Sequence, residues 1–86
     1  MGSAKDETLR AFGRSVRARR QALGLSQEQL AARAGIGRSY VTDIETGIRN
    51  VALWTIVRLA TALGTAPSAL LGEVDRLPAW QEHSGG

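Results

Sequence analysis

The chain has 86 residues, the size of one small domain. A chain of this length buries only about 60% of the surface that its unfolded form exposes, so its margin of stability is narrow. It has no cysteine and one histidine, His83, which excludes disulfides, thiol chemistry and a metal site built from these side chains. No apolar run approaches the roughly 20 residues of a membrane span, and no apolar leader opens the chain. We therefore expect a cytoplasmic protein with no membrane partner.

Basic residues are concentrated in the first two thirds of the chain. Lys and Arg number 11 against 8 Asp and Glu, a net charge of +3, and ten of the 11 are Arg. Residues 8–58 have a net charge of +6, whereas residues 59–86 have a net charge of −2. Arginine forks suit phosphates and base edges, so this imbalance favours an anionic partner, nucleic acid first. The charge alone is equally compatible with a well-solvated surface.

The first predicted helix follows a polar opening, residues 1–7, that we expect to be flexible. Thr8 or Asp6 is the expected cap, and Gly24 is expected to end the helix. Between them one helical face carries a stripe of apolar residues that is interrupted by Arg20: Leu9, Phe12, Val16 and Leu23. The stripe predicts a helix that packs on a core.

Two short helices are predicted next. The segment from Ser26 to Gln29 fits a capping box, so a second helix begins there and ends at Gly35. The third follows Gly37, which stands where a cap belongs, and ends at Gly47. The apolar residues that face inward from these two helices are Leu30, Ala31, Ala34, Val41 and Ile44.

The most apolar segment lies in the second half of the chain. A fourth helix is predicted up to Gly64, with an inner face of Leu53, Ile56, Val57, Ala60 and Leu63. Pro67 fits the first position of a short fifth helix, and Gly72 is expected to end it. Because no strand pattern or repeat occurs, the sequence predicts an all-α domain of five helices over residues 8–72. Residues 73–86 form a C-terminal tail.

The joint between the second and third helices has the features of a helix-turn-helix. Ala31 is small where two helices must cross closely, Gly35 gives the turn its backbone freedom, and Ile36 fills the angle. The third helix then presents short polar side chains beside an Arg, which can enter a major groove and reach base edges. The alternative is an ordinary helical hairpin without a ligand.

The same segment resembles a known family. The residues that carry the resemblance are Arg20-x-x-Leu23-Gly24-Leu25-Ser26-Gln27-x-x-Leu30-Ala31-x-x-Ala34-Gly35-Ile36 and Ile44-Glu45-x-Gly47. They look like the Cro and phage-repressor type of helix-turn-helix, often called XRE-like, over about residues 9–71. The resemblance implies a compact, lambda-repressor-like DNA-binding domain. Such a domain is usually a transcriptional repressor that acts as a homodimer on a palindromic operator.

A narrower resemblance extends over the third helix and the loop after it. The runs Arg38–Glu45 and Gly47–Val51 look like the controller proteins of restriction–modification systems, although many other regulators share them. Two positions depart from the wider pattern, because Val51 stands where a Pro is common and Ala52 where a Ser cap is common. These departures leave the start of the fourth helix and its backbone contact with phosphate open.

The resemblance also assigns a structural ion pair. Arg20 and Glu45 occupy positions that form a partly buried pair in the family, bracing the third helix on the first. An isolated buried charge is very costly, so we expect the two side chains to meet. The alternative is an Arg20 whose charged end reaches the solvent.

The candidate DNA contacts fall into two groups. The base-reading candidates are Arg38, whose fork matches guanine O6 and N7, with Ser39, Thr42 and Asp43. Asp43 is repelled by phosphates, so it either accepts from cytosine N4 or orients a neighbouring Arg. The phosphate candidates, assigned from the resemblance and from helix-terminus chemistry, are Gln27, Tyr40, Arg49 and Asn50. Each has an alternative as an ordinary surface or packing residue.

The end of the chain has more apolar residues than a small core needs. We expect a dimer interface formed by Leu70, Leu71, Val74, Leu77 and Trp80. The alternative is that the tail packs within its own chain, over Trp54 and Leu63.

The sequence therefore predicts a double-stranded DNA-binding regulator that acts as a homodimer and needs no cofactor or metal. A rival is an antitoxin-like protein, whose tail wraps a toxin while the helix-turn-helix represses its own operon. A neighbouring toxin gene would favour that rival. An enzyme lacks support, because His83 stands alone and no phosphate-binding loop occurs. An RNA reader is also disfavoured, because it would rely on stacking aromatics and the chain has four.

Overall fold

Helices account for all regular structure in the part of the chain that the structure describes, residues 3–78 of a computed structural model. They are α1 (Ala4–Ala22), α2 (Gln27–Ala34), α3 (Arg38–Thr46), α4 (Leu53–Ala62), the 3-10 helix η1 (Pro67–Leu71) and α5 (Gly72–Asp75). Across residues 3–78 there is no strand, and no helix is both long and apolar enough to cross a membrane. The predicted all-α fold is confirmed.

Helix α1 begins earlier than predicted. Ser3 caps it, because the Ser3 hydroxyl accepts a hydrogen bond from the Asp6 amide at 3.1 Å. The Asp6 carboxylate in turn accepts from the Ser3 amide at 3.4 Å. This second capping box starts the helix at Ala4, so the expected start at Thr8 or Asp6 is wrong and residues 4–7 are helical rather than flexible.

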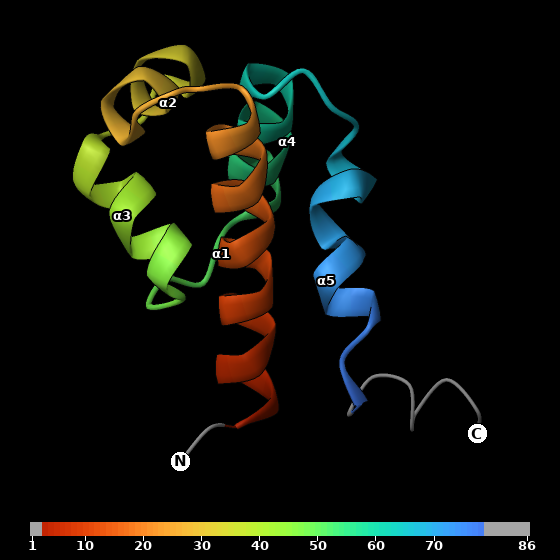
Figure 1. Cartoon of the computed structure of the whole chain (residues 1–86). Coiled ribbons are helices and arrows are strands. Elements are labelled where there is room, and N and C mark those ends of the chain that lie inside the picture. The colour runs from red at the N-terminus through yellow and green to blue at the C-terminus, as the bar shows by residue number, and fades with distance from the viewer. Residues whose placement is uncertain (1–2, 79–86) are drawn as a thin grey trace.

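The long helix α1 is the central support of the fold. It runs the length of the molecule in Figure 1, with α2 and α3 on one side, η1 and α5 on the other, and α4 behind. It packs directly against α3, η1 and α5, while α2 packs against α3 and α4. The two helices of the helix-turn-helix therefore rest on two separate supports, α1 and α4.

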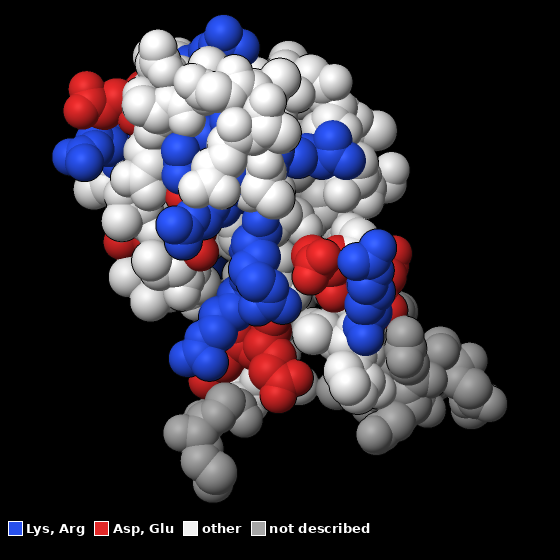
Figure 2. Space-filling model, in the orientation of Figure 1, with Lys and Arg blue, Asp and Glu red and all other residues white. Residues whose placement is uncertain are grey.

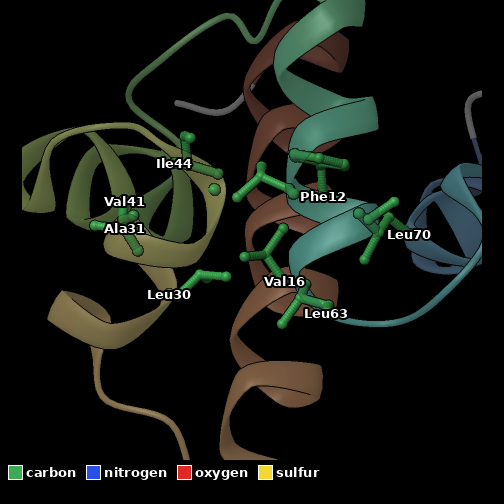
Figure 3. Close-up of a cluster of buried hydrophobic side chains, with 11 residues drawn as sticks. Phe12, Val16, Leu30, Ala31, Val41, Ile44, Leu63 and Leu70 are labelled. Atoms are coloured by element: carbon green, nitrogen blue, oxygen red, sulfur yellow. The ribbon is translucent and has the colours of Figure 1, made fainter.

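The core lies where these helices meet (Figure 3). Phe12 and Val16 project from α1 towards the inner faces of α2, α3, α4 and η1. The side chains that meet them are Leu30, Ala31, Ala34, Val41, Ile44, Leu59, Ala60, Leu63 and Leu70. The members from α2 and α3 are the expected inner faces of the second and third helices, so the sequence periodicity located this part of the core. Leu59 of α4, which is fully buried, was not among the expected inner residues.

Leu70 corrects the predicted dimer interface. It is fully buried, at 0% exposure, within the core of its own chain. The tight 3-10 turn that follows Pro67 directs it against α1 and α4 rather than outward. The expectation that Leu70 contributes to a surface patch is therefore wrong, and the alternative of packing within the chain holds for this residue.

The chain stays helical beyond Gly72. This glycine has φ −58° and ψ −42°, ordinary helical geometry, and it opens α5 instead of ending a helix. Val74 consequently packs against the core, Leu77 is half-buried and Leu71 is exposed. The remaining member of the predicted interface, Trp80, lies outside the described residues.

Two apolar residues that were expected to face inward are instead on the surface. Leu53 is 75% exposed, although Val51 before the helix and Ile56 one turn further along pack against the core. Leu23 is also exposed, since it is the residue at which α1 ends and the chain turns towards α2. Trp54, beside Leu53, is likewise exposed.

Gly13 permits the close crossing of α1 and α3. A Cβ atom at this position would lie 2.6 Å from the carbonyl oxygen of Glu45 and closer still to that of Ile44. Both neighbours are backbone atoms of α3, so they cannot rotate away. The separation between the two helices is therefore set by the absence of a side chain at Gly13.

We predict that Gly13→Ala lowers the free energy of unfolding by about 1–3 kcal/mol, the usual cost of overpacking, although alanine favours a helix. Gly72→Ala is the matched control, because a Cβ atom there meets nothing within 4 Å and the backbone is already helical. Urea unfolding of both variants measures the difference. Equal unfolding midpoints for Gly13→Ala and the wild type would show that the crossing is not tight.

Candidate nucleic-acid interface

The turn between α2 and α3 is shaped by local interactions. The Ser26 hydroxyl accepts from the Gln29 amide at 3.0 Å and Gln29 Oε1 accepts from the Ser26 amide at 2.8 Å, which is the predicted capping box. Gly35 then ends α2 in the left-handed region, at φ 69°, where a side chain would be strained. After only Ile36 and Gly37, α3 begins at Arg38.

Arg58 of α4 stabilises this turn through a contact that was not predicted from the sequence. Its Nη2 donates to the carbonyl oxygen of Gly35 at 3.0 Å. A carbonyl at the end of a helix lacks an intrahelical partner, and a cation there is favourable. The sequence signal for this contact was Arg58 itself, the one charged residue of α4.

The predicted ion pair between Arg20 and Glu45 is present and is largely shielded from solvent. Arg20 Nε donates to Glu45 Oε2 at 2.7 Å and Nη2 donates to Oε1 at 3.0 Å, a two-pronged contact. The side chains are 12% and 3% exposed. The hydrogen bonds that Arg20 donates to Glu45 raise the pKa of the Arg20 guanidinium, which burial alone would lower. The third nitrogen, Nη1, donates to the carbonyl oxygen of Leu25 at 2.9 Å.

Two of the candidate DNA contacts are tied to this pair. Gln27 Nε2 donates to Glu45 Oε1 at 3.1 Å, and Gln27 Oε1 accepts from the Thr42 hydroxyl at 3.0 Å. Glu45 therefore fixes the orientation of Gln27 on α2, and Gln27 fixes Thr42 on α3. The assignment of Gln27 to phosphate and of Thr42 to a base stays a prediction. Both residues also have this internal role.

Arg38 and Ser39, in the first turn of α3, are exposed. The Arg38 side chain is 65% exposed, and its Nε lies 3.8 Å from Glu28 Oε1 on α2, whose side chain is 75% exposed. A surface pair of this kind contributes about 0–1 kcal/mol, so it does not hold Arg38 against a stronger partner. Both residues are available at the end of α3 that a groove-reading helix presents.

A second cluster, separate from the side chains around Glu45, consists of Asp43, Arg49 and Tyr40. Arg49 Nε donates to Asp43 Oδ2 at 3.2 Å, and its guanidinium lies 5.2 Å from the centroid of the Tyr40 ring. Asp43 thus contacts a neighbouring Arg, and whether its carboxylate also accepts from a base stays a prediction. Asn50, in the loop after α3, is exposed.

Basic side chains also cover α1. Figure 2 shows them along the face of α1 nearest the viewer, with acidic side chains at its lower end and beside α5. Arg10, Arg14 and Arg17 of α1 are all exposed. The acidic partner near α5 is Glu73, which lies 3.8 Å from Arg14 and 3.2 Å from Arg76.

The geometry is that of a DNA-binding helix-turn-helix, and the comparisons with known proteins agree. Residues 16–70 match the helix-turn-helix family, so the chain belongs to that family. Its relatives are of the predicted XRE-like type. It is 44% identical over 61 residues to the control protein C.BamHI of Bacillus amyloliquefaciens. The matched segment covers 70% of this chain and 75% of that protein.

Two further matches agree with this assignment. The immunity repressor protein of Bacillus phage phi105 is 43% identical over 61 residues, covering 71% of this chain and 42% of the repressor. The crystal structure of the restriction-modification controller protein C.AhdI from Aeromonas hydrophila matches with a TM-score of 0.71 at 52% identity, covering 72% of this chain and 94% of that one. The chain is therefore a DNA-binding transcriptional regulator, and its relatives are regulators rather than enzymes.

We predict that Glu45→Ala lowers the free energy of unfolding by about 3–5 kcal/mol, because Arg20 would remain buried without its partner. Glu28→Ala is the matched control, since it removes a carboxylate whose side chain is 75% exposed. Urea unfolding at neutral pH measures both variants. The ion pair would have no structural role if the two variants unfolded at the same urea concentration.

Proposed function

We propose that the chain is a repressor that binds a palindromic operator as a homodimer and reads bases with the first turns of α3. The observation that carries this proposal is the fixed presentation of α3. Its inner row is buried in the core and held by the Glu45 network, while Arg38 and Ser39 stay exposed at its N-terminal end. Preorganised side chains lose little freedom on binding, which favours affinity and specificity together.

Arg38 is the proposed main base contact. Its fork matches O6 and N7 of guanine, and its surface pair with Glu28 is weak enough for DNA to replace. Ser39 lies next to it and can bond to several bases. Thr42, one turn further along α3, would read a base through the side of its hydroxyl that Gln27 leaves free.

The proposed phosphate contacts surround the reading helix. Gln27 is the first residue of α2, where backbone N–H groups favour an anion. Arg49 and Asn50 lie in the loop after α3, and Arg49 keeps two terminal nitrogens beyond the one that Asp43 accepts from. Tyr40 is half-buried, and its hydroxyl is the proposed fourth contact. These contacts supply the salt-dependent part of the affinity.

A homodimer follows from the small size of the reading surface. One reading helix contacts too few base pairs to specify a single site in a genome. Two copies related by a two-fold axis read both halves of a palindrome, whose centres are about 34 Å apart. With Leu70 in the core, the proposed interface consists of the exposed Leu71 with the partly buried Val74 and Leu77. This surface belongs to the end of η1 and to α5, on the side of α1 opposite α2 and α3.

We further propose that the regulated genes belong to a restriction–modification system. The support is similarity to the control protein C.BamHI and to the controller protein C.AhdI. A methyltransferase or endonuclease gene beside this one would favour the proposal. The site of action is then the cytoplasm, at the operator on the nucleoid, with no catalysis, cofactor or metal involved.

We predict that selection of bound DNA from a random library yields a palindrome. On that operator Arg38→Ala should cost about 1–3 kcal/mol and relax the preference at one base pair in each half. Arg19→Ala, an exposed Arg in the last turn of α1, is the control and should change neither property. Competition binding against single-base variants of the operator measures both. An equal loss on every sequence would reassign Arg38 to phosphate.

We also predict that Leu71→Asp shifts the protein from dimer to monomer, because a charge cannot be buried unpaired in an apolar interface. Leu71 is exposed, so the substitution leaves the core intact. Leu23→Asp, at the exposed end of α1, is the control and should remain a dimer. Sedimentation of the three proteins at tens of micromolar measures this. A wild-type monomer at that concentration would defeat the dimer proposal.

A further inference from the structure

Asp43 stands on the proposed reading helix, where a negative charge is unfavourable. DNA carries a phosphate charge about every 1.7 Å along its axis, and a carboxylate that approaches it is repelled. The carboxylate is not buried away from the ligand, because the Asp43 side chain is 27% exposed. It is also not required by the core, which α3 reaches through Val41 and Ile44.

The structure gives this carboxylate a defined orientation. Oδ2 accepts from Arg49 Nε at 3.2 Å, which leaves Oδ1 to accept from another donor. Arg49 is itself placed over the Tyr40 ring, 5.2 Å from its centroid, so the cluster links α3 to the loop after it. The pair of Arg49 and Asp43 is partly exposed, with side chains 56% and 27% exposed, so it orients the carboxylate without locking it. An oriented acceptor is suited to directional recognition rather than to general repulsion.

We infer that Asp43 is a specificity-determining residue that accepts a hydrogen bond from the N4 amino group of a cytosine in the major groove. This inference rests on the proposed function. Cytosine presents its amino group in that groove as a donor, and acidic side chains are the acceptors that match it. Arg49 is a positioning residue, because it directs the carboxylate and offsets part of its charge.

The Asp43 carboxylate also disfavours binding to DNA sequences that lack this cytosine. On DNA without a cytosine at this position, Oδ1 loses its hydrogen bonds to water and gains no donor in return. The negative charge still lies close to the phosphates. Asp43 therefore lowers the affinity for unrelated DNA while it raises the affinity for the operator. Discrimination through an unfavourable element of this kind needs no additional attractive contact.

The test compares Asp43→Asn with Glu28→Gln. Both substitutions remove one negative charge and keep the size of the side chain. Glu28 is the matched control because its carboxylate lies 3.8 Å from Arg38, with its side chain 75% exposed, at the edge of the same surface. Dissociation constants are measured on the operator that the wild-type protein selects from a random library, and on random DNA of the same length.

Asp43→Asn should weaken operator binding by about tenfold, the value of one good base contact, and strengthen binding to random DNA. The preference for one C·G pair in each half of the operator should disappear. Glu28→Gln should change both affinities by the same factor and keep the preference. Arg49→Gln should reduce the preference at the same base pair as Asp43→Asn, which loss of a phosphate contact alone would not do.

The inference is overturned if Asp43→Asn strengthens operator and random DNA equally, as expected for Glu28→Gln. It is also overturned if the lost preference falls on no C·G pair. Failure of the proposed function looks different, because the wild-type protein would then enrich no sequence from the library. Circular dichroism and the urea midpoint of each variant separate these outcomes from a loss of folding.

Discussion

The carboxylate of Glu45 ties three helices together. It accepts two hydrogen bonds from Arg20 of α1 and one from Gln27 of α2, while it belongs to α3. Arg20 also donates to the carbonyl of Leu25, so the connection between α1 and α2 joins the same network. A buried charge pair offers little net stability by itself, but an incomplete one is very costly. The network therefore tolerates one arrangement of α3 and penalises others.

Several side chains of the proposed DNA-binding surface are already engaged in the free protein. Gln27 and Thr42 are held by the network, and Arg49 is held by Asp43 and Tyr40. Immobilising a long side chain on binding costs about 0.5–1.5 kcal/mol, so earlier ordering reduces that cost. The most exposed candidate, Arg38, has only a weak surface pair. The proposed DNA-binding surface therefore combines side chains that are ordered before binding with one, Arg38, that would become ordered on binding.

Features that depend on neighbouring residues in the sequence could be predicted, whereas features that depend on contacts between helices could not. The Ser26 capping box and the glycines after α2 and α3 are short-range features, and the predicted bounds of these helices agree with the structure. The Ser3 capping box was equally local but was mistaken for a flexible opening. Leu70 was misplaced because helical periodicity does not carry across a 3-10 turn, and Gly13 gave no signal because its constraint comes from α3. The Arg20–Glu45 pair was found through the family resemblance.

The separation of α3 into two rows has an evolutionary consequence. Val41, Ile44 and Glu45 face the scaffold, whereas Arg38, Ser39 and Asp43 contribute nothing to the core. Under the proposed function, in which the outer row reads bases, mutations there would change the preferred DNA sequence without a loss of folding, so single substitutions would give new specificities. Thr42 is the exception, because its hydroxyl reaches Glu45 through Gln27. Divergence at that position would require a compensating change on α2.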